Sequence, residues 1–201
     1  EYTNSKVLPG WVHAEKDPYF LPSGFTYIWT STHKEWEPFF EDLSKDYAKV
    51  LTAPLPSKLQ TWVASARKKG NPKDKILFLM ENMSKDFRYF GDWRRHNGGV
   101  VPRTLAEIEK SRYGDCKDLA SVLVAMLRAL GIDANIALVR RGDNPWGREP
   151  DYLYPEMSSF NHAIAQAKVG KDTFWLAATN PVSSLEPFPD ISGRPAWILE
   201  A

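Results

Sequence analysis

An apolar segment with helical spacing constrains the fold of this 201-residue chain more than any other feature. It begins at Cys116, the only cysteine, directly after Tyr113-Gly114-Asp115, and Gly131 supplies a natural helix stop. The apolar positions recur as on one face of a helix: Leu119, Val122, Leu123, Met126, Leu127 and Leu130. The sequence therefore predicts a core helix whose first turn carries the cysteine.

The position of Cys116 in that first turn has a chemical consequence. A helix N-terminus is the positive end of the macrodipole and has free N–H groups, and both favour the nucleophilic thiolate. The same N–H groups can stabilise an oxyanion. A lone cysteine is also a common small buried hydrophobe, and Asp115 and Asp118 have an alternative interpretation as N-cap and N3 residues. Their negative charge also disfavours a thiolate, so this segment alone leaves both interpretations open.

A second candidate group is His162, within a predicted strand over residues 160–169. One face of this strand carries His162, Ile164 and Gln166 because side chains alternate along a strand. Gly170-Lys171 is predicted as a hairpin turn, and residues 173–179 as the return strand.

The predicted hairpin has a definite register. A two-residue turn pairs Val169 with Asp172 and, further along, His162 with Thr179. Ala177 is then a diagonal neighbour of His162 on the same face. A carboxylate at position 177 could orient the imidazole, but this chain has alanine there.

Three segments together resemble the core of the transglutaminase-like superfamily. Residues 112–118 (RYGDCKD) and the helix after them resemble its cysteine element, and Phe160-Asn161-His162 resembles its histidine strand. Residues 175–179 (WLAAT) resemble its Trp-Leu-Asp-Pro-Thr element, with the aspartate and the proline replaced. The resemblance implies an α+β fold of the transglutaminase-like or papain-like cysteine protease type. In this fold, N-terminal helices precede a nucleophile at a helix N-terminus that packs on an antiparallel sheet.

The resemblance also implies an activity. Cys116 matches the nucleophile and His162 the imidazole, whereas Ala177 stands where the family has an aspartate. The implied chemistry is cysteine-dependent acyl transfer or hydrolysis on a peptide or carboxamide through a thioester, by a hydrolase or acyltransferase. A peptidase or amidase is favoured over cross-linking because nothing in the sequence identifies an amine site. Ala177 predicts weakened activity; the alternative is a catalytically inactive domain that binds a protein or peptide.

Several residues are candidates for supporting roles. Thr179 or Asn180 could replace the missing acceptor for the imidazole, Trp93 or Tyr113 could add an oxyanion donor, and Asp115 is beside the nucleophile.

The interval from Arg140 to Ser159 is the candidate substrate loop, with Trp146, Tyr152 and Tyr154 as its aromatic residues. Loops of this length in compact domains are usually functional or disordered. The alternative is that these aromatic residues pack over a sheet edge. Arg141-Gly142-Asp143 is interpreted as a polar turn.

The rest of the chain predicts helices first and strands later. Residues 1–30 suggest an irregular arm, and residues 31–201 a single transglutaminase-like domain excised from a larger protein. Helical periodicity marks 36–47 and 59–66, Thr104 and Glu107 have capping-box spacing, and residues 132–138 alternate as a strand. A third helix after Pro72 is expected to bury Ile76, Leu77, Met80, Met83 and Phe87.

Composition and net charge limit the kinds of binding partner that we expect. With 43% hydrophobic residues the chain can bury a core, and its net charge of +1 gives no reason to expect nucleic acid or an anionic membrane as a partner. No apolar run is long enough for membrane insertion, and the histidines and single cysteine have no metal-ligand spacing, so no metal and no cofactor is expected. The expected partners are a protein or peptide substrate and flanking domains of the parent protein. The resemblance implies a bacterial protein, exported or periplasmic.

Overall fold

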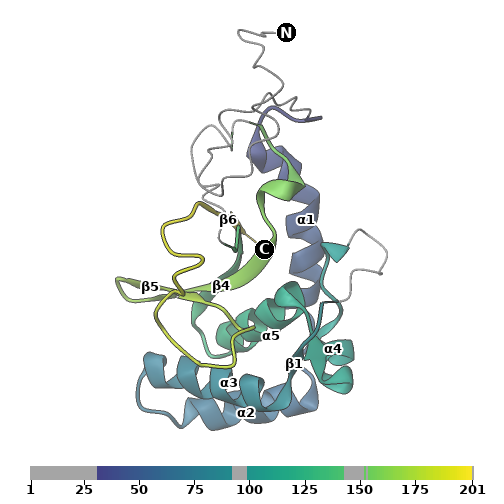
Figure 1. Ribbon diagram of the computed structural model, residues 1–201. Helices are drawn as coiled ribbons and strands as arrows, with labels where there is room; N and C mark the ends of the chain where they lie inside the picture. Colours follow the sequence, from purple (N-terminus) through teal and green to yellow (C-terminus); the bar gives the residue numbers. More distant parts are fainter. Residues whose placement is uncertain (1–30, 92–98, 143–151, 153, 201) are drawn as a thin grey trace, which may run out of the picture. The chain divides into compact units, whose positions relative to one another are not determined.

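The computed structural model describes residues 31–91, 99–142, 152 and 154–200 (Figure 1). The chain divides into two compact units, Glu1–Thr32 and His33–Ala201. The irregular arm predicted for residues 1–30 lies outside the described residues, as do Trp93 and Trp146.

Three helices open the second unit, as the periodicity predicted. They are α1 (Trp36–Leu51), α2 (Ser57–Arg67) and α3 (Pro72–Asp86). Asn71 caps α3 by accepting a hydrogen bond from the backbone N–H of Asp74. The expectation that Leu77 is buried is wrong: Leu77 is half-buried and Leu79 is buried instead. Position 79 is three residues after Ile76 and so lies on the same helix face.

Two further helices lead to the cysteine. The predicted capping box is confirmed at the start of α4 (Leu105–Ser111), where Glu107 N donates to Thr104 Oγ1 and Thr104 N donates to Glu107 Oε2. Helix α5 (Cys116–Ala129) begins at the cysteine as predicted, and Gly131 after it has a φ of 78°. This left-handed conformation is one that glycine adopts readily.

The main sheet is antiparallel, with strand order β5-β4-β3-β6. Its strands are β3 (Asp133–Val139), β4 (His162–Val169), β5 (Asp172–Leu176) and β6 (Ala196–Leu199). Strand β6 had no counterpart among the sequence predictions. The predicted pair of Val169 with Asp172 is confirmed, but the ladder ends at Ala165 and Leu176. The predicted pair of His162 with Thr179 is therefore wrong.

Three minor elements remain. Strands β1 (Arg88–Tyr89) and β2 (Tyr113–Gly114) pair in parallel just before the cysteine, and Met157–Ser159 form a 3-10 turn, η5, just before β4. The β1–β2 pair thereby brings residues 88–89 close to the start of α5.

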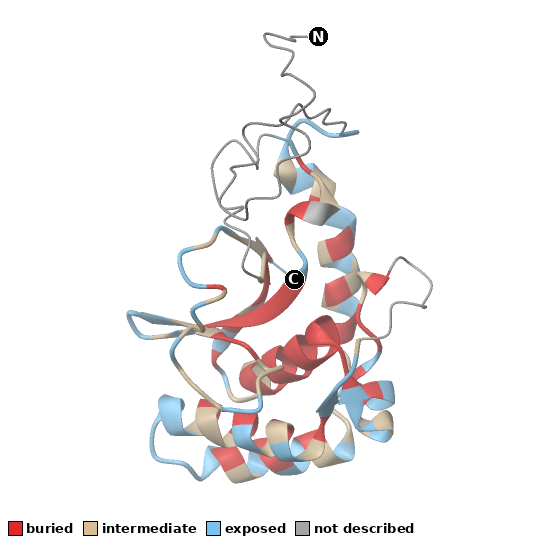
Figure 2. Ribbon diagram, viewed as in Figure 1, coloured by how far each residue is buried: buried red, intermediate tan, exposed pale blue. Residues whose placement is uncertain are grey.

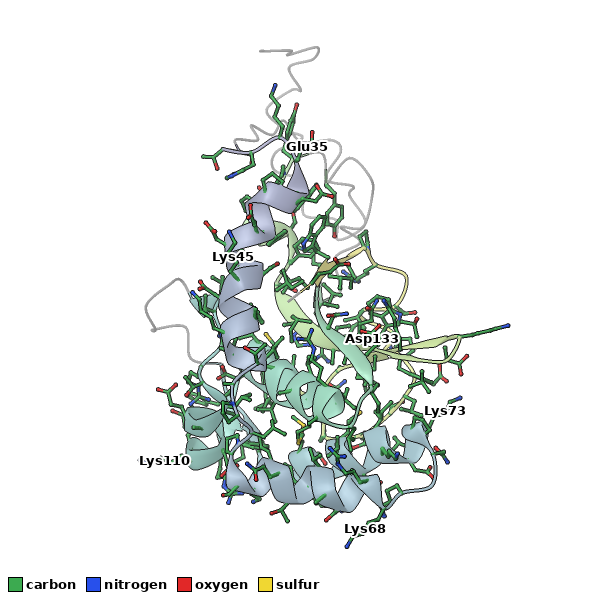
Figure 3. The ribbon with its side chains drawn as sticks, turned by 180° about the vertical axis from the view of Figure 1, so that it is seen from behind. Glu35, Lys45, Lys68, Lys73, Lys110 and Asp133 are labelled. Atoms are coloured by element: carbon green, nitrogen blue, oxygen red, sulfur yellow. The ribbon has the colours of Figure 1, made fainter. Side chains whose placement is uncertain are left out.

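Helix α5 is the centre of the core, and almost all of it is buried (Figure 2). It packs on β3 and β4 and also contacts α1, α2, α3 and α4. The opposite face of the sheet has a second, smaller apolar cluster, which includes Ile191 from the segment after β5. Charged side chains such as Lys45, Lys68 and Lys110 project from the periphery (Figure 3). Helices gathered on one face of an antiparallel sheet confirm the α+β class.

Within the described ranges, no helix has both the length and the apolar character needed to cross a bilayer.

Candidate active site

The start of α5 positions Cys116. Asp115 is the N-cap residue, and its carboxylate accepts a hydrogen bond from the backbone N–H of Asp118, 3.2 Å away, as the sequence predicted. Gly114 lies where a side chain does not fit, since a Cβ there would be 2.8 Å from the Cβ of Asp118. The chain therefore turns sharply into the helix with the cysteine as its first residue.

The junction of β3 and β4 positions His162. His162 is the first residue of β4 and pairs with Val139, the last residue of β3. The side chain of Asn161 extends this pairing: its Oδ1 accepts from the backbone N–H of Arg141 (2.7 Å) and its Nδ2 donates to the carbonyl of Arg141 (2.9 Å). Two reciprocal hydrogen bonds thus hold the backbone beside the imidazole.

Cys116 and His162 come together at one cavity of about 90 Å³. A backbone hydrogen bond with Ala163, the residue after the histidine, ties the thiol to the start of β4. The rest of the lining comes from α1, α5, the segment before α4, β3 and the segment leading into β4: Leu43, Tyr47, Gly99, Val100, Asp115, Lys117, Leu138, Met157, Phe160, Asn161 and Ala163.

The thiol is buried, and burial raises the pKa of Cys116 above its ordinary value. The hydrogen bond with Ala163 and the charge of Lys117 act in the opposite direction, whereas Asp115 adds to the increase. Desolvation thus opposes the thiolate that a helix N-terminus favours.

The imidazole is buried as well, with 6% of its surface exposed. Burial, and to a smaller extent the nearby charge of Arg141, lower the pKa of His162 to about 4, while the charge of Asp190 acts in the opposite direction. Its Nε2 has no hydrogen-bond partner within the described part of the chain. At neutral pH the site therefore holds a neutral thiol and a neutral imidazole.

Ala177 lies in an apolar environment rather than beside a polar group. It is 2% exposed and packs with Ile164, Val139 and Ile191 on the outer face of the sheet. No carboxylate occupies the position where the family resemblance implies one.

Thr179 and Asn180, the suggested replacement acceptors, serve Arg141 instead of His162. The guanidinium of Arg141 donates to Thr179 Oγ1 (3.4 Å) and to Asn180 Oδ1 (3.2 Å), and Asp190 completes its coordination. The structure gives neither residue a hydrogen bond to the imidazole.

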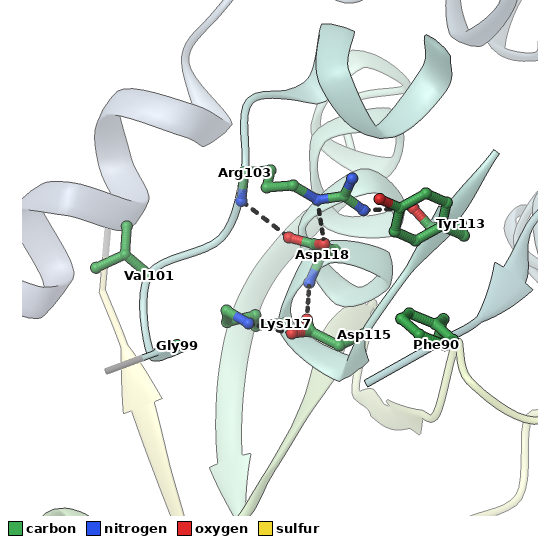
Figure 4. A pocket seen from close by; sticks show the side chains of 8 residues that line it. All are labelled: Phe90, Gly99, Val101, Arg103, Tyr113, Asp115, Lys117 and Asp118. Atoms are coloured by element: carbon green, nitrogen blue, oxygen red, sulfur yellow. Dashed lines mark hydrogen bonds and ion pairs between the residues drawn. The ribbon is translucent and has the colours of Figure 1, made fainter. Parts of the chain in front are cut away.

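A network of buried charged side chains surrounds the start of α5 (Figure 4). Asp118 accepts from Arg103 through the backbone N–H (2.8 Å) and through Nε (2.7 Å), and both side chains are almost fully buried. Lys117 forms an ion pair with Asp115. The contacts between Arg103 and Asp118 connect the segment before α4 to the first turn of α5.

Tyr113 belongs to this network. Its ring lies 4.6 Å from the guanidinium carbon of Arg103 and makes an edge contact with Phe90. It lines the small pocket of Figure 4 and is not among the residues lining the Cys116 cavity. Its predicted role as an oxyanion donor has no support from this position.

The two described aromatic residues of the candidate substrate loop differ. Tyr152 packs its ring against Trp36 and Phe160, and its carbonyl accepts from Trp36 Nε1 (3.1 Å). Tyr154 is about half exposed. Tyr152 therefore supports Phe160, a wall of the cavity, while a contact of either tyrosine with substrate stays a prediction.

The sequence reasoning missed Asn161, Arg141, Asp190 and the buried Arg103. Asn161 adjoins the histidine, so its motif offered a signal, whereas the roles of the other three depend on contacts between distant segments. Tyr89 was also missed: partial burial and electrostatic interactions with Cys116 and Asp115 raise its pKa.

No group of three or more His, Cys, Asp or Glu side chains that could hold a metal ion exists among the residues with assigned positions.

A buried thiol at a helix N-terminus, together with an imidazole at the start of an antiparallel strand, defines an α+β domain of the cysteine-protease-like class. The model of the transglutaminase-like superfamily matches residues 60–179, which include both groups. The chain therefore belongs to the transglutaminase-like superfamily.

One solved structure shares this fold, and two others were also matched. A candidate protease from Parabacteroides distasonis is 19% identical with a TM-score of 0.52; the match covers 68% of this chain and 26% of that one. A candidate cysteine protease from Cytophaga hutchinsonii is 20% identical, with a TM-score of 0.44 and coverage of 68% and 43%. A TGase structure is 14% identical, with a TM-score of 0.43 and coverage of 70% and 38%.

The match thus spans about a quarter of the Parabacteroides chain, and at this identity it indicates a shared fold alone. No curated protein matches the sequence significantly.

Proposed function

We propose that this domain transfers the acyl group of a peptide or carboxamide to water, with Cys116 as nucleophile and His162 as the acid–base group. The observation that carries the proposal is the shared cavity, which brings a thiol from α5 and an imidazole from β4 to the same space. A nucleophile and a base that face one volume are the minimum arrangement for covalent acyl transfer.

The first half of the reaction forms a thioester. As the sulfur attacks the carbonyl carbon, His162 takes the thiol proton and the carbonyl electrons move to oxygen. The free N–H groups in the first turn of α5 stabilise this oxyanion. The carbon–nitrogen bond then breaks, and His162 returns the proton to the leaving amine.

The second half regenerates the enzyme. Water attacks the thioester while His162 takes its proton, and the sulfur leaves and recovers a proton as the carboxylic acid is released. Among the described residues that line the cavity, the only carboxylate is Asp115, and it is paired with Lys117. No free anion is thus available there to bind an amine, which favours hydrolysis over cross-linking.

The pKa directions favour a specific order of proton transfer. Because burial raises the pKa of Cys116 and lowers that of His162, the pair rests neutral. Proton transfer then accompanies sulfur attack instead of preceding it. The proposed activity is weakened by this weak base and by the alanine at position 177.

Acylation by p-nitrophenyl acetate tests the proposal. We expect an acetyl group on Cys116 by mass spectrometry of proteolytic fragments, none in Cys116→Ala, and at least tenfold slower acylation in His162→Ala. His33→Ala serves as the matched histidine control and should react normally, because His33 is exposed, precedes α1 and does not line the Cys116 cavity. Acylation that proceeds equally fast without His162 would refute the nucleophile–base pair.

A binding module is the second candidate function, and Ala177 is the observation that favours it. The apolar packing at this position and the unpartnered Nε2 are what a domain without catalysis would tolerate. A protein that fails to acylate above the rate of a free thiol, and binds a peptide equally well as Cys116→Ala, would establish this alternative.

A further inference from the structure

The cavity beside Cys116 has the properties of a selective subsite. Its walls are apolar side chains from four separate segments: Leu43, Tyr47, Val100, Leu138, Met157 and Phe160. Leu43, Tyr47 and Leu138 are buried, and Val100, Met157 and Phe160 are half-buried at its edge. The space is thus largely apolar, and Cys116 and His162 both line it.

We propose that this cavity binds the aliphatic side chain of the substrate residue whose carbonyl Cys116 attacks, and so selects leucine-, isoleucine- or methionine-sized residues there. The inference rests on the proposed acyl transfer and adds its substrate class.

The size of the cavity supports this choice. An apolar protein cavity of about 150 Å³ holds benzene. A volume of about 90 Å³ therefore accommodates roughly four carbon or sulfur atoms, by the same proportion. That is the size of a leucine, isoleucine or methionine side chain, larger than alanine and smaller than phenylalanine.

The polar groups of the lining are already occupied, which excludes charged side chains. Lys117 is paired with Asp115, and Asn161 with the backbone of Arg141. The hydroxyl of Tyr47 donates to the carbonyl of Val100, 3.1 Å away. Apart from the reacting pair, the described lining therefore offers no partner for a buried charge, whose desolvation would go uncompensated.

The connectivity of the thioester places the side chain on the acyl side. Only a carbonyl carbon and an α-carbon separate the sulfur from the side chain of the acyl residue. Because Cys116 lines the cavity, that side chain is the part of the substrate nearest to it. The amine side leaves before the thioester is hydrolysed and needs no lasting place there.

Peptidyl chloromethyl ketones test the subsite, because their carbon alkylates the sulfur with loss of chloride and keeps the side chain in place. The probes are acetyl-Ala-Ala-X chloromethyl ketones with leucine, alanine, phenylalanine or aspartate as X. Each alkylation rate is divided by the rate for iodoacetamide, which has no side chain. We expect the normalised alkylation rate of the leucine probe to be at least about tenfold higher than the rates of the alanine, phenylalanine and aspartate probes.

Two variants connect the preference to the cavity. Val100→Phe fills it and should remove the leucine preference while iodoacetamide still reacts. Val101→Phe is the matched control, because Val101 lines the neighbouring pocket of Figure 4 instead. Met157→Ala enlarges the cavity. It should raise the alkylation rate of the phenylalanine probe relative to that of the leucine probe at least about fivefold. Thermal unfolding verifies that each variant is folded. Because one variant fills the cavity and the other enlarges it, the test does not depend on a single substitution.

The outcomes separate the two proposals. Equal normalised rates for all four probes, with His162-dependent acylation intact, would overturn the subsite and leave the proposed function standing. A leucine preference that persists in Val100→Phe would also overturn it. Failure of His162-dependent acylation in the earlier experiment would instead overturn the proposed function.

Discussion

The guanidinium of Arg141 forms an ion pair with Asp190, with 2.5 Å between Nε and Oδ2. The two residues are far apart in the sequence, because Arg141 comes just after β3 and Asp190 comes after β5 and before β6. Both charges act on His162, in opposite directions. The chain thus has a carboxylate within electrostatic reach of the imidazole, but a neighbouring arginine offsets it.

Removing this arginine should change the titration of the histidine. We expect Arg141→Gln to raise the pKa of His162 above about 4, because one charge that lowers it is gone, and Asp190→Asn to lower the pKa further. NMR titration of the His162 ring measures both. Arg140→Gln removes the same charge one residue earlier and should have the smaller effect; an unchanged His162 titration in Arg141→Gln would contradict the assignment.

Burial of His162 should also make stability depend on pH. Its pKa is about 4 in the folded protein against 6.5 for the free group, so between these values the unfolded chain binds the extra proton. The contribution is therefore absent above about pH 6.5, and as pH falls the free energy of unfolding decreases, by up to about 3 kcal/mol near pH 4. Urea unfolding from pH 4 to 7.5 measures it.

His162→Gln isolates this effect from the other titrating groups. The difference between the two unfolding curves should grow as pH falls, with the variant losing less stability. If the free energy of unfolding changed equally with pH in the two proteins, His162 would have the same pKa in the folded and unfolded states.

Introducing the family aspartate should be costly here. Ala177→Asp places a carboxylate among Ile164, Val139 and Ile191, and we expect a loss of about 2–4 kcal/mol in the free energy of unfolding. Ala178→Asp, at a half-buried neighbour, is the matched control and should cost less. If Ala177→Asp instead leaves stability intact and accelerates acylation, the carboxylate has found the free Nε2 of His162.

Loss of the buried ion pair between Arg103 and Asp118 should reduce the free energy of unfolding more than loss of an exposed ion pair. Arg103→Met leaves Asp118 buried without its cation, which we expect to cost about 3–5 kcal/mol in denaturant unfolding. Lys49→Met breaks the exposed pair with Asp46 and should cost less than about 1 kcal/mol. Similar losses in the two variants would mean that the Arg103 network does not hold the start of α5.

Gly114→Ala tests the close approach that lets the chain enter α5. A Cβ there meets the Cβ of Asp118 at 2.8 Å, and we expect a loss of about 1–3 kcal/mol together with slower Cys116 alkylation. Gly70→Ala has nothing within 4 Å of the added Cβ and provides the control. Unaltered stability in both would show that the helix start can shift to make room.

Local patterns were enough for much of the fold. The start of α5 at Cys116, the capping box of Thr104 and the hairpin register at Val169 all follow from interactions between residues close in sequence, and all three are confirmed. Strand β6 was missed because its four residues lie beside β3 only after the chain has returned from a distant loop.

The site divides in the same way. The sequence by itself determined which thiol and which imidazole are available and that position 177 has no carboxylate. Only the tertiary structure decided that Arg141 and Asp190 meet, that Ala177 faces an apolar cluster, and that an apolar cavity adjoins the thiol. Desolvation and charge interactions depend on distances between segments far apart in sequence, so the protonation of Cys116 and His162 is a property of the folded chain.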